Sequence, residues 1–383
     1  MKQEEGEEAQ KLVHGINIEI AETKLELTVD EVVEGYVGSL GISQLLHVFL
    51  VSLAWIFDSQ NTLATIFSDA QPPSWRCISP HLHADNTTVV PAMAAASLCS
   101  SIGDSKGGGS VCGLPPGTWE WVGGNRSSTI AEWGLICDRK FLACVPASLF
   151  FLGSLLVGGE ALAETKSTEK ESLWTTRWAA KRMIVVMITG FGVGFVYYGV
   201  QLNVENLNFN LYFTVALNAL MEIPAVVIGT ILSSFTNRRL LFSQSAFIAG
   251  VSCILCIVFS HGGRAKADES GGSWPQLIIE GIGFMAASTA FNILYIYCVE
   301  LFPTNVRNSA VSMLRQALML GASISPLMVV LGRLSPSLSF LVFGFLSIFS
   351  GVMSSWLPET KNAPLYETLK QQEEDEKQSS EVK

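Results

Sequence analysis

The sequence predicts an all-α polytopic membrane protein. The mean hydropathy is +0.37, and eight apolar stretches are each about long enough to cross a bilayer, which takes roughly 20 helical residues. A soluble chain of 383 residues would not carry so many apolar runs that are nearly free of charge. Helices are expected because every backbone polar group in lipid must find its partner within the segment. The short alternating strands of a transmembrane barrel are not visible in the sequence.

The eight expected spans form a group of two and a group of six. A polar loop, about Ser68–Lys140, separates the first two spans, whereas the last six follow one another closely. In chain order the expected spans are Leu40–Gln60, Phe141–Gly159, Met183–Gln201, Leu211–Leu232, Leu240–Ser260, Leu277–Tyr297, Val311–Gly332 and Leu338–Leu357.

This grouping predicts five regions. They are an acidic cytoplasmic tail (1–39), the first two spans with their extracellular loop (40–159, loop 68–140), a cytoplasmic linker (160–182), a six-span C-terminal half (183–357) and a cytoplasmic tail (358–383).

Charge is concentrated in the two tails. The net charge is −10, and the acidic runs that open and close the chain account for it. Such runs are solvated and argue against nucleic-acid partners. The polar, acid-rich start predicts no cleavable signal peptide, so the first span is expected to act as the insertion signal.

The positive-inside rule predicts that both termini are cytoplasmic. With that orientation the three inner connections carry eight basic residues, and the short outer connections carry three. The long loop then lies outside, where its own charges count little.

The long loop has two further features typical of an extracellular segment. It contains two glycosylation sequons, at Asn86 and Asn125. It also contains four of the eight cysteines, which predicts two disulfides with three possible pairings; these are Cys77, Cys99, Cys112 and Cys137. The alternative is a disordered loop with free thiols.

Four segments carry a family resemblance. They read AWIFDSQNTLATIFSDA near the first span, STIAEWGLIC at residues 128–137, ELFPTNVRNSAVSM at 300–313 and LPETKNAPL at 357–365. Together they resemble the organic cation/carnitine transporters of the major facilitator superfamily, the plant branch in particular. The resemblance covers about Asp30–Gly158 and Arg177–Leu369.

The resemblance implies a major-facilitator-type helix bundle with a truncated N-terminal half. Members of the family have twelve spans in two halves of six, but here the match stops after Gly158 and resumes near Trp174. Spans three to six are therefore expected to be missing, which leaves two spans plus a complete six-span C-terminal half.

Charged residues inside the spans are candidate substrate-binding residues, because a charge at the centre of a bilayer costs roughly 2.5–3.5 kcal/mol. The candidates are Asp58, Glu222, Glu280 and Arg315. Each has an alternative structural role. Asp58 can cap the first span, Glu222 can hydrogen-bond beside the Pro224 kink, and Glu280 and Arg315 can snorkel to the interface.

Tyr198 completes the predicted substrate site, since quaternary ammonium groups bind over aromatic faces. Its alternative role is packing or an interfacial belt. By the resemblance, Glu300, Pro303 and Arg307 form a gating loop rather than a chemical site. Gly190 and Gly194 lie four apart on one helix face, which predicts a close helix contact.

The sequence therefore predicts a secondary transporter and not an enzyme. By the resemblance, its substrates are organic cations or carnitine-like zwitterions, coupled to a proton, a sodium ion or neither, in the plasma or vacuolar membrane. No cofactor and no metal is expected, because no phosphate-binding loop, zinc motif or catalytic triad is visible. The alternative is a transport-incompetent isoform that is inert or modulates full-length relatives.

Overall fold

A computed structural model describes residues 41–70, 72, 75–77, 111–112, 114, 119–168, 173–207, 209–263, 274–361, 364 and 366–381. The chain divides into two units, Met1–Leu63 and Ala64–Lys383. The described part of the first unit belongs to one helix, α3 (Ile42–Ser68), which continues into the second unit.

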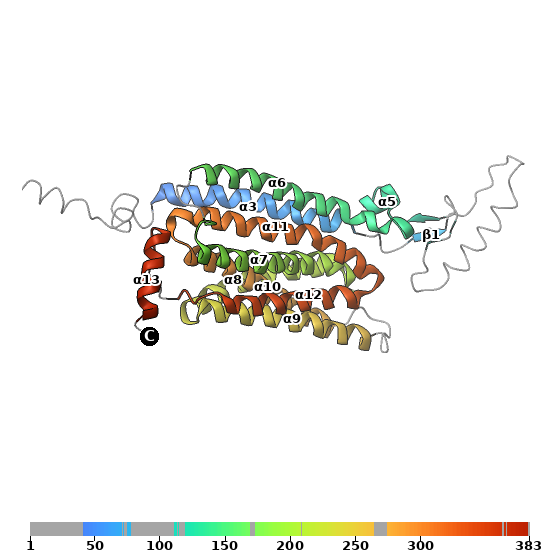
Figure 1. The fold of residues 1–383 in the computed structure, drawn as a ribbon. Helices are drawn as coiled ribbons and strands as arrows, with labels where there is room; N and C mark the ends of the chain where they lie inside the picture. Colours follow the sequence, from blue (N-terminus) through green and yellow to red (C-terminus); the bar gives the residue numbers. More distant parts are fainter. Residues whose placement is uncertain are drawn as a thin grey trace, which may run out of the picture. The chain divides into compact units, whose positions relative to one another are not determined.

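The second unit is a bundle of seven helices that are long and apolar enough to cross a membrane. They run along one another in Figure 1. Their bounds are α6 (Val145–Thr168), α7 (Arg177–Leu202), α8 (Leu211–Phe235), α9 (Arg238–Gly263), α10 (Trp274–Leu301), α11 (Thr304–Leu334) and α12 (Pro336–Met353). The predicted fold class is confirmed.

Several helices are longer than the spans predicted from hydropathy. α3 continues to Ser68, α6 continues to Thr168 within the predicted linker, and α7 already begins at Arg177. Hydropathy marks only the part of a helix that is apolar, whereas backbone hydrogen bonding continues into polar turns.

Local sequence signals set the helix ends. The Asn210 side chain accepts hydrogen bonds from the backbone N–H groups of Tyr212 and Phe213 and so caps α8. Pro303 separates α10 from α11, and Pro336 opens α12 at a first-turn position that needs no N–H.

Small residues let α7 and α11 approach each other closely. A Cβ at Gly194 would overlap the carbonyl group of Leu318, and one at Gly321 would overlap the carbonyl oxygen of Phe191. The close contact predicted from Gly190 and Gly194 is therefore confirmed, and its partner is α11.

One end of the bundle carries part of the long loop. A short antiparallel pair, β1 (Trp75–Cys77) and β2 (Trp119–Trp121), is followed by helix α5 (Thr129–Trp133) and the 3-10 helix η1 (Cys137–Cys144). Ile130 and Leu135 pack with Val330 of α11 in a small core. The loop is thus anchored at this end.

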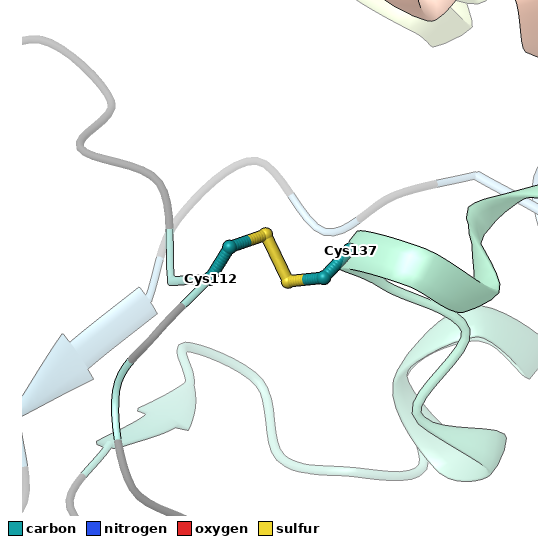
Figure 2. The surroundings of a disulfide bond; sticks show 2 residues. All are labelled: Cys112 and Cys137. Atoms are coloured by element: carbon teal, nitrogen blue, oxygen red, sulfur yellow. A yellow bond between two sulfur atoms is a disulfide. The ribbon is translucent and has the colours of Figure 1, made fainter.

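A disulfide joins Cys112 to Cys137 at the start of η1 (Figure 2). Closing a loop of this length contributes roughly 3 kcal/mol in the chain-entropy model. Cys77 is also disulfide-bonded, whereas Cys99 and the Asn86 sequon lie outside the described residues. The cysteines of the bundle itself are free and buried.

The opposite end is crossed by a C-terminal helix, α13 (Leu369–Glu381), as Figure 1 shows. Leu369 is buried in the main hydrophobic core, and the Gln372 side chain donates to the carbonyl oxygen of Leu301 at 3.3 Å. The predicted tail at 358–383 therefore contains a helix that packs on the bundle.

We expect Gly194→Ala to destabilise the bundle by about 1–3 kcal/mol, because the added methyl group forces α7 away from α11. Thermal unfolding of the purified chain in detergent measures the effect. Gly281→Ala is the matched control, since nothing lies within 4 Å of the added Cβ. Equal unfolding temperatures for the two variants would contradict the close contact.

Candidate functional site

Six aromatic rings from three helices contact one another in the bundle, and one of them, Tyr197, hydrogen-bonds a carboxylate. We call this group the aromatic–acid cluster. Its members are Phe151 of α6, Tyr197 and Tyr198 of α7, Glu222 of α8, and Phe284, Phe291 and Tyr295 of α10.

Tyr197 is the centre of the cluster. Its ring centroid lies 4.7 Å from that of Phe291 and 5.6 Å from that of Phe284. Its hydroxyl donates a hydrogen bond of 2.6 Å to Oε1 of Glu222. The tyrosine is buried, so it fixes the position of the carboxylate from the protein side.

Tyr198 extends the cluster toward α6. Its ring centroid lies 4.8 Å from that of Phe151 and 6.2 Å from that of Phe291. Both Tyr198 and Glu222 are half-buried, so each keeps a part that a ligand can reach. The structure thus connects two of the predicted site residues through Tyr197.

Such an arrangement suits a quaternary ammonium ion. A cation within about 6 Å of an aromatic centroid is attracted to the ring face, and a carboxylate held by a neutral donor supplies the opposite charge without a competing cation. Ligand sites commonly combine apolar and aromatic walls with a few placed polar groups.

Arg315 lies on a second feature of the bundle. It is exposed and lines a cavity of about 550 Å³ between α6 and α11, together with Gly153, Ser154, Val157, Gly158, Ser312 and Gln316. α11 begins at Thr304, about three turns before Arg315, so this side chain is further from the helix end than predicted. Arg315 is close enough to Tyr295 for its charge to act on that hydroxyl.

Glu280 is buried within the bundle. It is 3% exposed and accepts a hydrogen bond of 3.0 Å from the amide Nδ2 of Asn218 on α8. The structure thus pairs this acid with a donor on α8, and the snorkelling alternative stays a prediction.

The side chain of Asp58 lies outside the described residues, although its backbone belongs to α3. Asn125 lies in an exposed turn of the long loop. In the described part of the chain, no group of three or more His, Cys, Asp or Glu side chains is placed to hold a metal ion.

The predicted gating residues lie at the α13 end of the bundle, where Glu300 joins α9, α10 and the segment after α12. Arg238 at the start of α9 forms an ion pair of 3.0 Å with Glu300, and Thr360 donates to the same carboxylate at 2.7 Å. Glu359 accepts from the backbone N–H of Arg238 at 2.8 Å. We call these four residues the Glu300 network.

The other two gating residues shape the α10–α11 connection. Pro303 is the N-cap residue of α11, and Arg307 donates to the carbonyl oxygen of Phe302 at 3.4 Å. The Glu300 network and this turn hold three helix ends together. A contact that opens and closes when helices move must join several helix ends in this way.

Some members of the site were not singled out from the sequence. Phe284 and Phe291 are seven residues apart, so both lie on one face of α10. That spacing was a usable signal. The pairing of Tyr197 with Glu222 could not be predicted, because no sequence rule brings those two positions of α7 and α8 together.

The fold and the site define a polytopic helical membrane transporter. Residues 155–371 match the model of the family described as "Sugar (and other) transporter", which is more than half of the chain. The chain belongs to this family of the major facilitator superfamily.

Comparison with individual proteins refines this. The chain is 27% identical to "Organic cation/carnitine transporter 5" of Arabidopsis thaliana, over 92% of this chain and 95% of the relative. It is 27% identical to "Organic cation/carnitine transporter 3" of the same plant, over 90% and 93%. It is 34% identical to "Solute carrier family 22 member 15-like" of Xenopus tropicalis, over 50% of this chain and 38% of the relative.

The first of these alignments also bears on the missing spans. It runs over 518 positions although the chain has 383 residues. A large internal part of the relative therefore has no counterpart here, as the absence of spans three to six requires.

We expect Glu222→Gln to weaken binding of tetraethylammonium by about tenfold or more, because the change removes the only charge in the described cluster that attracts a cation; tenfold corresponds to about 1.4 kcal/mol. Equilibrium binding of labelled tetraethylammonium to the purified chain measures it. Glu374→Gln on the exposed face of α13 is the control. Unchanged affinity in Glu222→Gln would remove this carboxylate from the site.

We expect Glu300→Arg to lower thermal stability, because it sets two cations against each other at the start of α9. The double variant Arg238→Glu/Glu300→Arg restores the ion pair, and we expect it to recover part of the loss. Thermal unfolding of the single and double variants measures the coupling. Additive losses would show that the ion pair contributes nothing.

Proposed function

We propose that this chain is a secondary transporter of organic cations or carnitine-like zwitterions. The observation that carries the proposal is the aromatic–acid cluster, in which the hydroxyl of Tyr197 holds Glu222 and the ring of Tyr197 contacts that of Phe291. The relatives supply support, since two that match most of the chain are called organic cation/carnitine transporters.

Arg315 favours zwitterions among these substrates. Carnitine carries a quaternary ammonium and a carboxylate, so it needs an acid with aromatic rings for one end and a base for the other. Glu222 with the rings fits the first requirement, and Arg315 near Tyr295 fits the second. A plain cation such as tetraethylammonium gains nothing from Arg315.

Transport would proceed by alternating access between two parts of the bundle. The Glu300 network and the turn at Pro303 and Arg307 are proposed as the contact that closes one end. The coupling ion of such a cycle is proposed to be a cation, a proton or sodium, exchanged across the lipid bilayer.

The alternative function is that of a transport-incompetent isoform. The internal gap in the alignment favours it, because only α3 and α6 precede the six-span half. A chain without spans three to six can retain a binding cluster and still fail to enclose a substrate. It would then be inert or would modulate full-length relatives.

Uptake into vesicles that contain only this chain separates the two functions. We expect uptake of labelled carnitine above that of empty vesicles. We expect Arg315→Gln to lower carnitine uptake severalfold and to leave tetraethylammonium uptake unchanged, since only carnitine has a carboxylate to lose. Uptake equal to that of empty vesicles would reject transport and favour the isoform.

We propose further that the protein is a multi-pass protein of the plasma or vacuolar membrane with both termini cytoplasmic and the long loop outside. The exposed turn at Asn125 is then accessible to glycosylation, and Asn86 is the second candidate. We expect enzymatic deglycosylation to increase electrophoretic mobility, with a smaller shift in Asn125→Gln. A wild-type chain that shows no shift would argue against this placement of the loop.

A further inference from the structure

Glu280 and Asn218 form a buried polar pair between α10 and α8, separate from the hydrogen bond of Glu222. Glu280 is 3% exposed and Asn218 is 2% exposed. A single hydrogen bond joins them in the described structure, from Nδ2 of Asn218 to Oε1 of Glu280 at 3.0 Å.

The two remaining oxygen atoms of the pair have no hydrogen-bond donor among the described residues. Oε2 of Glu280 and Oδ1 of Asn218 are both buried, and neither has a hydrogen-bond partner in the part of the chain that the structure describes. Both atoms are acceptors when Glu280 is a carboxylate. Leaving a buried acceptor unpaired costs about 1–3 kcal/mol, and more when the group is charged.

One proton resolves this deficit. A protonated carboxyl has one donor and one acceptor, and so does the edge of a primary amide. A proton on Oε2 turns a buried unpaired acceptor into a donor of the kind that Oδ1 lacks, while Oε1 keeps the bond from Nδ2. The pair is complementary when Glu280 is neutral and deficient when it is charged.

The surroundings of Glu280 offer no cation in compensation. Cys253 and Cys256 of α9 are the titratable groups close enough to interact with it. On α8, Glu222 lies one turn beyond Asn218 and is bound by Tyr197 of α7. Among the described residues Glu280 forms no ion pair, and its one hydrogen bond comes from the neutral amide of Asn218.

The pair also lies next to the proposed cation site. Phe284 is one turn from Glu280 on α10 and stacks on Tyr197, whereas Glu222 is one turn from Asn218 on α8. A cation bound at Glu222 would thus stand within about two helical turns of Glu280. Its positive charge favours the carboxylate form of a nearby acid.

We propose that the Glu280–Asn218 pair is a proton-binding site that releases its proton when an organic cation binds at the aromatic–acid cluster. The O–H bond of Glu280 breaks, its electron pair remains on the carboxylate and the proton passes to water that enters as α8 and α10 move. The exchange of one cation for one proton leaves the charge inside the membrane unchanged. The exchange rests on the proposed function, but the binding of the proton does not.

Difference infrared spectroscopy of the purified full chain tests proton binding directly. The C=O stretch of a carboxylic acid is absent from carboxylates, so we expect wild-type protein at neutral pH to show an acid band that Glu280→Gln removes and the exposed control Glu374→Gln retains. An amide at position 280 keeps the donor and acceptor that face Asn218, so this variant should fold. If no band in the wild type depends on Glu280, the proposal is overturned.

A second variant covers the case in which Glu280→Gln does not fold. Asn218→Ala removes the partner of the acid, so we expect the band to move to higher frequency because the C=O group loses its hydrogen bond. A band that stays in place would show that the acid does not belong to this pair.

Proton release tests the exchange. Addition of tetraethylammonium to the chain in weakly buffered detergent solution should acidify the medium, as a pH indicator reports, and Glu280→Gln should bind the cation without acidification. Binding in the wild type without proton release overturns the exchange. An absence of cation binding with an intact Glu280 acid band would reject the proposed substrate and leave the proton site standing.

Discussion

The hydrocarbon core of a bilayer offers no water to an acidic side chain, so each acid in these helices needs a donor on a neighbouring helix. Two such pairs lie within the spans, and a third ties helix ends together at the α13 end of the bundle. Tyr197 of α7 donates to Glu222 of α8, Asn218 of α8 donates to Glu280 of α10, and Arg238 of α9 pairs with Glu300 of α10. Polar contacts thus link the same helices whose apolar faces pack, and one of them places Glu222 at the hydroxyl of Tyr197.

The three acids differ in the interaction that each still has available. Glu300 is matched by a cation and a hydroxyl, which suits a structural contact at a helix end. Glu222 has a neutral donor and remains half-buried, so its negative charge is available to a ligand. Glu280 is covered and lacks one donor, so it is matched only with a proton. The chemical partner of each acid, rather than its mere presence in a span, is the basis on which we propose separate roles in gating, substrate binding and proton binding.

Much of the fold could be predicted from the sequence, because the apolar runs are long and the rule that lipid imposes on the backbone leaves few choices. The close contact at Gly194 also followed from residue spacing. Helix ends did not, since Thr168 and Arg177 lie in polar turns that hydropathy does not register. The pairing of acids with donors on other helices needed the three-dimensional structure, as the burial of Glu280 shows.

The central claim is that the aromatic–acid cluster receives a quaternary cation. The most direct measurement is an experimental structure of the chain in lipid nanodiscs with tetraphenylarsonium, whose arsenic atom marks the position of the positive charge. We expect the arsenic to lie beside Glu222 and the rings of Tyr197 and Phe291. Arsenic found only in the α6–α11 cavity near Arg315, with the rings unoccupied, would contradict it.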